Sequence, residues 1–71
     1  MEAREWIDAF AAVLGVEPPD EATVDRLLEL AATAAHASQR TAAPLACYLA
    51  GRAGIDPERA AALAEALSGG Q

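Results

Sequence analysis

Three residues near the middle of the chain have types and spacing suited to chemistry: His36, Arg40 and Pro44. The histidine is the only one in the sequence, and the arginine follows it by four residues, which places both on one face of a continuous helix. The proline suits the first turn of a following helix, where free backbone N–H groups attract anions. Together the three residues predict a pocket for a carboxylate or phosphate. The alternative is structural, with His36 bonded to a buried carbonyl and Arg40 at a helix terminus.

The single cysteine, Cys47, is the other candidate for reactivity. It lies outside any CxxC motif, and one histidine cannot complete the four ligands of a zinc site. A cysteine–histidine nucleophile pair would also need a third residue to orient it, and none is evident. We therefore interpret Cys47 as a small hydrophobic core residue. We expect no metal, no cofactor and no enzymatic activity.

Two further patterns have both a structural and a binding interpretation. Glu21, Asp25 and Glu29 repeat at helical spacing and predict a solvated acidic face, or alternatively a docking surface for a basic partner. Trp6 is expected to anchor the core. If it is exposed instead, a tryptophan is typical of a protein-binding hot spot.

Length and composition limit the classes of function. The 71 residues predict one domain, residues 1–71, and the net charge of −6 without any lysine argues against nucleic acid and anionic membranes as partners. One cysteine fits a reducing compartment, and no apolar run approaches the ~18 residues of a membrane span, so a cytoplasmic location is expected. Twenty alanines leave few large side chains for a core, which favours stabilisation by a partner or by homodimerisation.

Hydrophobic periodicity predicts the elements that must position these residues. Large apolar residues recur at helical spacing in four segments, and we expect helices at about 2–14, 21–38, 43–53 and 57–67. Short, proline-containing connectors separate several of them. The predicted fold is therefore all-α, either a compact bundle or an orthogonal array of four short helices.

The ends and faces of these helices are also predicted. Gly15 is expected to end the first helix, and Asp20 or Thr23 to cap the second. The start of the third helix stays open, because Thr41 is a suitable cap whereas a residue before a proline, here Ala43, prefers an extended backbone. Inward-facing positions are expected at five large residues of the last two helices: Leu45, Tyr48, Leu49, Leu63 and Leu67.

The order of several residues resembles a small bacterial domain of unknown function. The residues that carry the resemblance are Trp6, Leu14-Gly15, Leu27–Ala31, Ala35-His36, Arg40, Ala42–Leu45, Leu49 and Gly51. That domain occurs alone or attached to a molybdenum cofactor guanylyltransferase. The resemblance implies an association with maturation of the molybdenum cofactor, and it assigns no role to any residue. Ala32-Thr33 depart from the family pattern, which favours a basic residue there.

These observations lead to two expectations for function. The first is a non-catalytic helical interaction or accessory module, which binds a protein partner such as the guanylyltransferase, or a second copy of itself. It would use its alanine-rich faces and the segment from His36 to Leu45, here called the corner. The alternative is a small-anion or cofactor-phosphate binding domain that uses His36, Arg40 and the N-terminus of the third helix.

Overall fold

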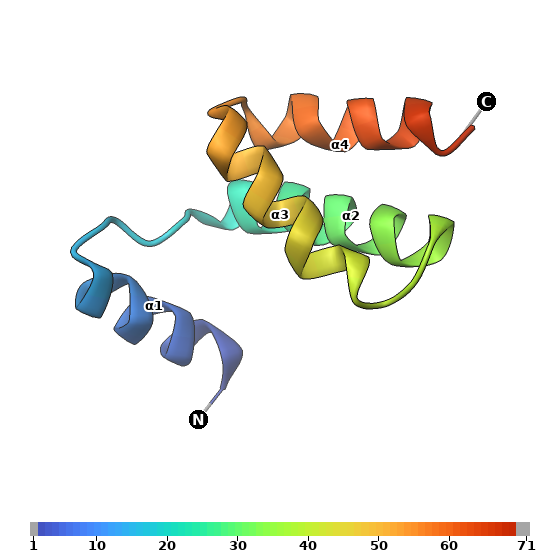
Figure 1. Ribbon diagram of the computed structural model, residues 1–71. Coiled ribbons are helices and arrows are strands. Elements are labelled where there is room, and N and C mark those ends of the chain that lie inside the picture. The colour runs from blue at the N-terminus through green and yellow to red at the C-terminus, as the bar shows by residue number, and fades with distance from the viewer. Residues whose placement is uncertain (1, 70–71) are drawn as a thin grey trace.

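A computed structural model describes residues 2–69, which fold into four helices. They are α1 (Ala3–Leu14), α2 (Glu21–Ala37), α3 (Ala42–Ala53) and α4 (Pro57–Leu67), shown in Figure 1. Each predicted helix is present, with its bounds displaced by at most one residue. The all-α prediction is thus confirmed for the described part of the chain.

The helix ends follow the local chemistry of the sequence. Asp20 caps α2 by accepting a hydrogen bond from the Thr23 amide at 2.8 Å, so the choice between these two residues falls to the aspartate. Gly15 ends α1 in the left-handed region at φ 77°, which glycine adopts without steric cost. At the other end of α1, Glu2 and Glu5 form a reciprocal capping box.

The start of α3 is settled by a tight turn. The amides of Ala42 and Ala43 donate to the carbonyls of Gln39 and Arg40 at 2.9 and 3.1 Å, and the helix begins at Ala42. These bonds hold Ala43 in helical geometry, which outweighs its preference for an extended backbone before proline. Pro44 is consequently the third residue of α3, where its missing N–H leaves no helical bond unmade.

The packed part of the molecule consists of α2, α3 and α4. In Figure 1, α4 runs alongside α2 and α3 crosses them, and α2 contacts both of the others. The core contains Leu30, Ala60 and Ala61, which are at most 8% exposed. Around it pack partly buried side chains, all small except one: Ala46, Cys47, Ala50, Ile55 and Ala64. Because so much of this core is alanine, the helices lie close together but bury little apolar area.

Helix α1 stands apart from this three-helix unit (Figure 1). The connector between α1 and α2, residues 15–20, contains Pro18 and Pro19. The Arg4 guanidinium donates a hydrogen bond to the Pro19 carbonyl and forms an ion pair with Asp8 at 3.2 Å. These bonds and the two fixed proline φ angles hold α1 at the end of the connector.

The large apolar residues do not face inward as the sequence predicts. Leu45, Tyr48 and Leu49 are 61–63% exposed, and Trp6 is 53% exposed rather than a core anchor. Leu63 and Leu67 are also exposed. The reason on α3 is that its small side chains, Ala46 and Ala50, let the helix approach α2 closely, so the opposite, larger side chains are left in solvent.

The molecule is correspondingly more open than its mass predicts. It exposes 5423 Å², whereas a folded monomer of 7.3 kDa exposes about 4,200 Å². Its radius of gyration is 12.6 Å, against about 11 Å for a compact domain of this length. The chain therefore presents roughly 1,200 Å² more surface than a self-contained domain would.

Candidate functional site

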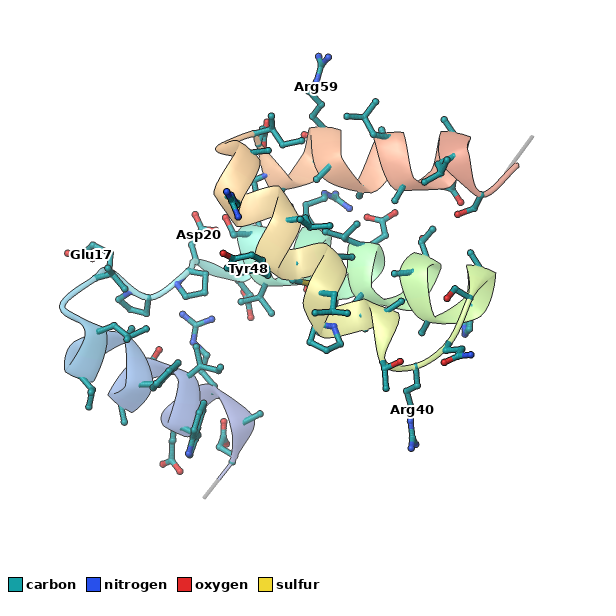
Figure 2. All side chains as sticks on the ribbon, viewed as in Figure 1. Glu17, Asp20, Arg40, Tyr48 and Arg59 are labelled. Carbon is teal, nitrogen blue, oxygen red and sulfur yellow. The ribbon has the colours of Figure 1, made fainter. Side chains whose placement is uncertain are left out.

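The three residues predicted to bind an anion lie near one another in sequence but on separate structural features. His36 is in the last turn of α2, Arg40 lies in the turn after that helix has ended at Ala37, and Pro44 is inside α3. All three are exposed. Figure 2 shows the Arg40 side chain pointing away from the helices into solvent. The continuous helix that would align His36 with Arg40 is therefore interrupted.

The hollow that His36 lines also contains an acidic residue. His36 lines a shallow hollow together with Thr33, Ala37, Glu65 and Ser68, and neither Arg40 nor Pro44 contributes to that lining. A carboxylate in the same hollow repels an anion. The anion-binding hypothesis thus gains no supporting geometry from the placement of these residues.

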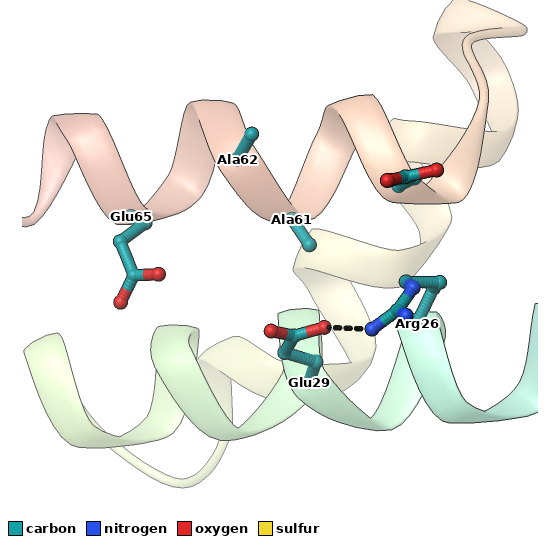
Figure 3. Close-up of a pocket in the computed structure, with 6 residues that line it drawn as sticks. Arg26, Glu29, Ala61, Ala62 and Glu65 are labelled. Carbon is teal, nitrogen blue, oxygen red and sulfur yellow. Dashed lines mark hydrogen bonds and ion pairs between the residues drawn. The ribbon is translucent and has the colours of Figure 1, made fainter.

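A second polar hollow runs between α2 and α4 (Figure 3). Figure 3 shows Arg26 and Glu29 on α2 and Glu65 on α4, with the α4 carboxylate directed toward α2; Glu58 also lines the hollow. Arg26 and Glu29 form an ion pair at 2.8 Å, and this hydrogen bond raises the pKa of the Arg26 guanidinium above its ordinary value. Glu29 is therefore engaged within the chain, and the predicted acidic face is an exposed surface with one internal ion pair.

Cys47 lies in the interface between α2 and α3. Its thiol is 3.9 Å from the carbonyl oxygen of Leu27, and its side chain packs against the core. Burial raises the pKa of the thiol, which disfavours the reactive thiolate. The environment agrees with the interpretation of Cys47 as a small core residue. Within residues 2–69, no three His, Cys, Asp or Glu side chains gather in a way that could hold a metal ion.

An apolar hollow lies at the corner. It has a volume of about 320 Å³ and is almost entirely apolar. We call it the corner groove, and its lining residues are Ala34, Ala37, Ser38, Ala42, Leu45, Ala46, Leu49, Ala64, Leu67 and Ser68. Several of them belong to the corner itself. The corner thus contributes to an apolar depression rather than to a charged pocket.

A second apolar hollow lies between α1 and α2. It has a volume of about 490 Å³, and we call it the α1–α2 groove. Its lining residues are Ala3, Arg4, Ile7, Pro19, Val24, Leu27 and Leu28. The Arg4 guanidinium is already bonded to Asp8 and to the Pro19 carbonyl, so the charge of this groove is satisfied within the chain.

Next to the α1–α2 groove, α1 presents an apolar face of its own. Trp6, Phe10, Val13 and Leu14 are between 45% and 81% exposed. The rings of Trp6 and Phe10 stack on each other, with their centroids 5.1 Å apart. Large aromatic side chains on an exposed helix face are typical of protein-binding surfaces.

The sequence predicted that the large apolar residues of α3, such as Leu45 and Leu49, face the core, whereas the structure leaves them exposed. The sequence of α3 contained a signal for the correct orientation. One apolar face of this helix is small, with Ala46 and Ala50, and the other is large, with Leu45 and Leu49. Only one of these faces can pack against α2, and the smaller one allows the closer approach. The larger face is then available to line the corner groove.

Comparison with known families supplies a classification. The family model described as Domain of unknown function (DUF6457) matches residues 1–69, nearly the whole chain. The chain belongs to this family. All four helices of this DUF6457 domain lie inside the match, so both apolar grooves are parts of the family domain. No curated protein and no solved structure matches the sequence significantly.

Within residues 2–69, every helix is too short or too polar to cross a bilayer.

Proposed function

We propose that this chain is a non-catalytic helical interaction module that binds a protein partner at the corner groove. The observation that carries the proposal is an apolar depression whose leucines are exposed. Leu45, Leu49 and Leu67 line it and are 63%, 61% and 89% exposed. A depression lined by leucine and alanine is suited to an apolar helix or extended segment of another protein.

The energetics favour occupation of this groove. Removing apolar surface from water contributes about 25 cal/mol per Å², so covering three exposed leucines can supply several kcal/mol of binding free energy. The lining also includes Ala34, Ala42 and Ala46, whose short side chains permit a partner backbone to approach closely.

The resemblance noted from the sequence identifies a candidate partner. A related small domain occurs attached to a molybdenum cofactor guanylyltransferase, and we propose that this enzyme, or another protein of the same maturation pathway, is the partner. The proposed role is accessory, with the nucleotide chemistry performed by the enzyme. We propose that the association takes place in the cytoplasm, in agreement with the single unpaired cysteine.

The test is a direct binding measurement between the purified chain and the purified guanylyltransferase. Isothermal titration calorimetry should detect saturable binding with a negative heat-capacity change, the signature of apolar burial. Leu49→Glu places a charge in the corner groove and should weaken binding at least tenfold, about 1.4 kcal/mol. Leu63→Glu is the matched control, because Leu63 is also an exposed leucine, 51% exposed, but does not line the groove.

The outcomes test separately whether the guanylyltransferase is the partner and whether the corner groove is the binding surface. Equal weakening by both variants would show that general surface charge, not the groove, controls binding. If the titration releases no heat and the two purified proteins do not sediment together in the ultracentrifuge, the guanylyltransferase is not the partner. Circular dichroism of each variant must show unchanged helicity, since both substituted side chains are exposed and lie outside the buried core.

A further inference from the structure

We infer that the α1–α2 groove is an interface between two copies of this chain, in which each copy packs the Trp6–Phe10 face of its α1 against the other copy's groove. This proposal concerns a different surface from the corner groove. The proposed dimer does not depend on whether a partner protein binds at the corner groove.

The first argument is the surface left uncovered. The chain exposes roughly 1,200 Å² more than a compact monomer of its mass, and a standard protein interface buries about 800 Å² on each partner. Helix α1 contributes to this exposed surface, because the large apolar side chains of one of its faces, Trp6, Phe10, Val13 and Leu14, are 45–81% exposed. A symmetric pairing through α1 would therefore cover an area of the size that stable association needs.

The second argument is self-complementarity. The groove is lined on one side by α1 itself, through Ala3 and Ile7, and on the other by Leu27 and Leu28 of α2. A two-fold axis beside α1 brings both grooves and both α1 helices together, so each copy donates an aromatic face and accepts one. One association event then covers the stacked Trp6–Phe10 pair and the groove at the same time.

The third argument is that α1 does not cover its aromatic face with its own chain in this structure. The connector holds Pro18 and Pro19, whose φ angles are fixed, and the Arg4 guanidinium is bonded to the Pro19 carbonyl. With α1 in this position its aromatic face is left uncovered, Trp6 being 53% and Phe10 45% exposed. The groove accordingly needs an occupant from outside, and the second copy carries an apolar helix of suitable character.

The net charge of the chain should make dimerisation depend on ionic strength. Each copy has a net charge of −6, so two copies repel each other at long range. The groove itself holds one charged side chain, Arg4, which is already paired. Salt screens the repulsion and leaves the apolar contact intact, so association should become stronger as ionic strength rises.

The test uses the wild-type chain and its single tryptophan. Sedimentation equilibrium over a range of about 1 to 500 μM should show the mass rising from 7.3 kDa toward twice that value. Trp6 emission should shift to shorter wavelength over the same concentration range, because the ring leaves water as the copies associate. Both midpoints should move to lower concentration in higher salt.

Two variants locate the interface. Leu28→Glu charges the groove, and Trp6→Gln removes the aromatic donor; each should raise the dissociation constant at least tenfold. Leu63→Glu is the matched control, since it adds the same charge at an exposed leucine of α4 and should leave dimerisation nearly unchanged. All three side chains are more than half exposed, so the helical signal of the monomers should be preserved.

Three results would overturn the inference. A mass that stays at 7.3 kDa with water-exposed Trp6 emission at every concentration means that no copy occupies the groove. Short-wavelength emission in a monomer means that α1 folds back on its own chain. A dimer lost in Leu49→Glu but kept in Leu28→Glu means that the copies meet at the corner groove. The first two results leave guanylyltransferase binding open, because the calorimetric titration measures it separately. The third would make a second copy a competitor for the corner groove.

Discussion

The rings of Trp6 and Phe10 lie one turn apart on α1 and stack with centroids 5.1 Å apart and planes inclined by 28°. The two side chains remain 53% and 45% exposed. The aromatic residues of this helix thus contact each other rather than the core. A stacked aromatic pair is already ordered before binding, so less side-chain entropy is lost when a partner covers it.

The core should depend on one large side chain. Leu30 is 4% exposed and belongs to a core made mostly of alanines, which cannot expand to fill a void. Leu30→Ala should lower the free energy of unfolding by about 2–5 kcal/mol, a large part of the total for so small a domain. Urea unfolding followed by circular dichroism measures the loss. Leu67→Ala, at an 89% exposed position, should change it by no more than about 0.5 kcal/mol, and comparable losses would contradict the assigned core.

The helices were predictable because their signals are local. Gly15, Asp20 and the Asp56-Pro57 pair act on their own turns of backbone, and each sits where the structure begins or ends a helix. Thr41 and Ala43 were ambiguous because two local preferences competed. The tight turn at Arg40 decided between them.

The inward faces were not predictable because they depend on which helices meet. Periodicity groups Leu45 and Leu49 on one side of α3 but does not say whether α2 packs against that side or against Ala46 and Ala50. The usual rule that the larger apolar face is buried fails here, since close approach of alanine faces is the arrangement adopted. For α1 the rule fails differently, because Trp6 has no neighbouring helix that covers it.

The cap at Asp20 should give the domain a pH-dependent stability. The hydrogen bond from the Thr23 amide holds the pKa of Asp20 below its ordinary value of 3.8, so the folded state favours the ionised carboxylate. Its stabilisation is present above the ordinary pKa and is lost as the pH falls through the folded pKa. Thermal unfolding measured at about pH 5 and about pH 2.5 should therefore show a smaller drop in Tm for Asp20→Asn than for the wild type.

Asparagine keeps an acceptor for the Thr23 amide without titrating, so Asp20→Asn isolates the carboxylate from the other acids. Asp20→Ala removes the cap altogether and should lower the Tm already at neutral pH. An identical pH dependence in the wild type and Asp20→Asn would show that the cap contributes nothing through its charge.

The thiol of Cys47 should be slow to react in the folded chain. Burial raises its pKa above the ordinary value of 9.0, and its position between α2 and α3 restricts access. Alkylation by iodoacetamide at mildly alkaline pH should be severalfold slower in buffer than in urea, where the chain is unfolded. The control is Ala62→Cys in a Cys47→Ala background, because Ala62 is exposed on α4 and should react at similar rates in both solvents. Equal rates for Cys47 in buffer and in urea would place this thiol at the surface.

The arrangement around His36 predicts that inorganic anions do not bind there. Glu65 lines the same hollow, while the Arg40 guanidinium points into solvent beyond the end of α2. Addition of phosphate or molybdate should therefore cause no saturable change in the His36 ring signals measured by NMR at constant pH and ionic strength. Glu65→Gln removes the opposing charge and tests whether repulsion alone prevents binding. A saturable shift in the wild type that disappears in Arg40→Ala would establish the anion pocket, because it requires the two side chains to converge in solution.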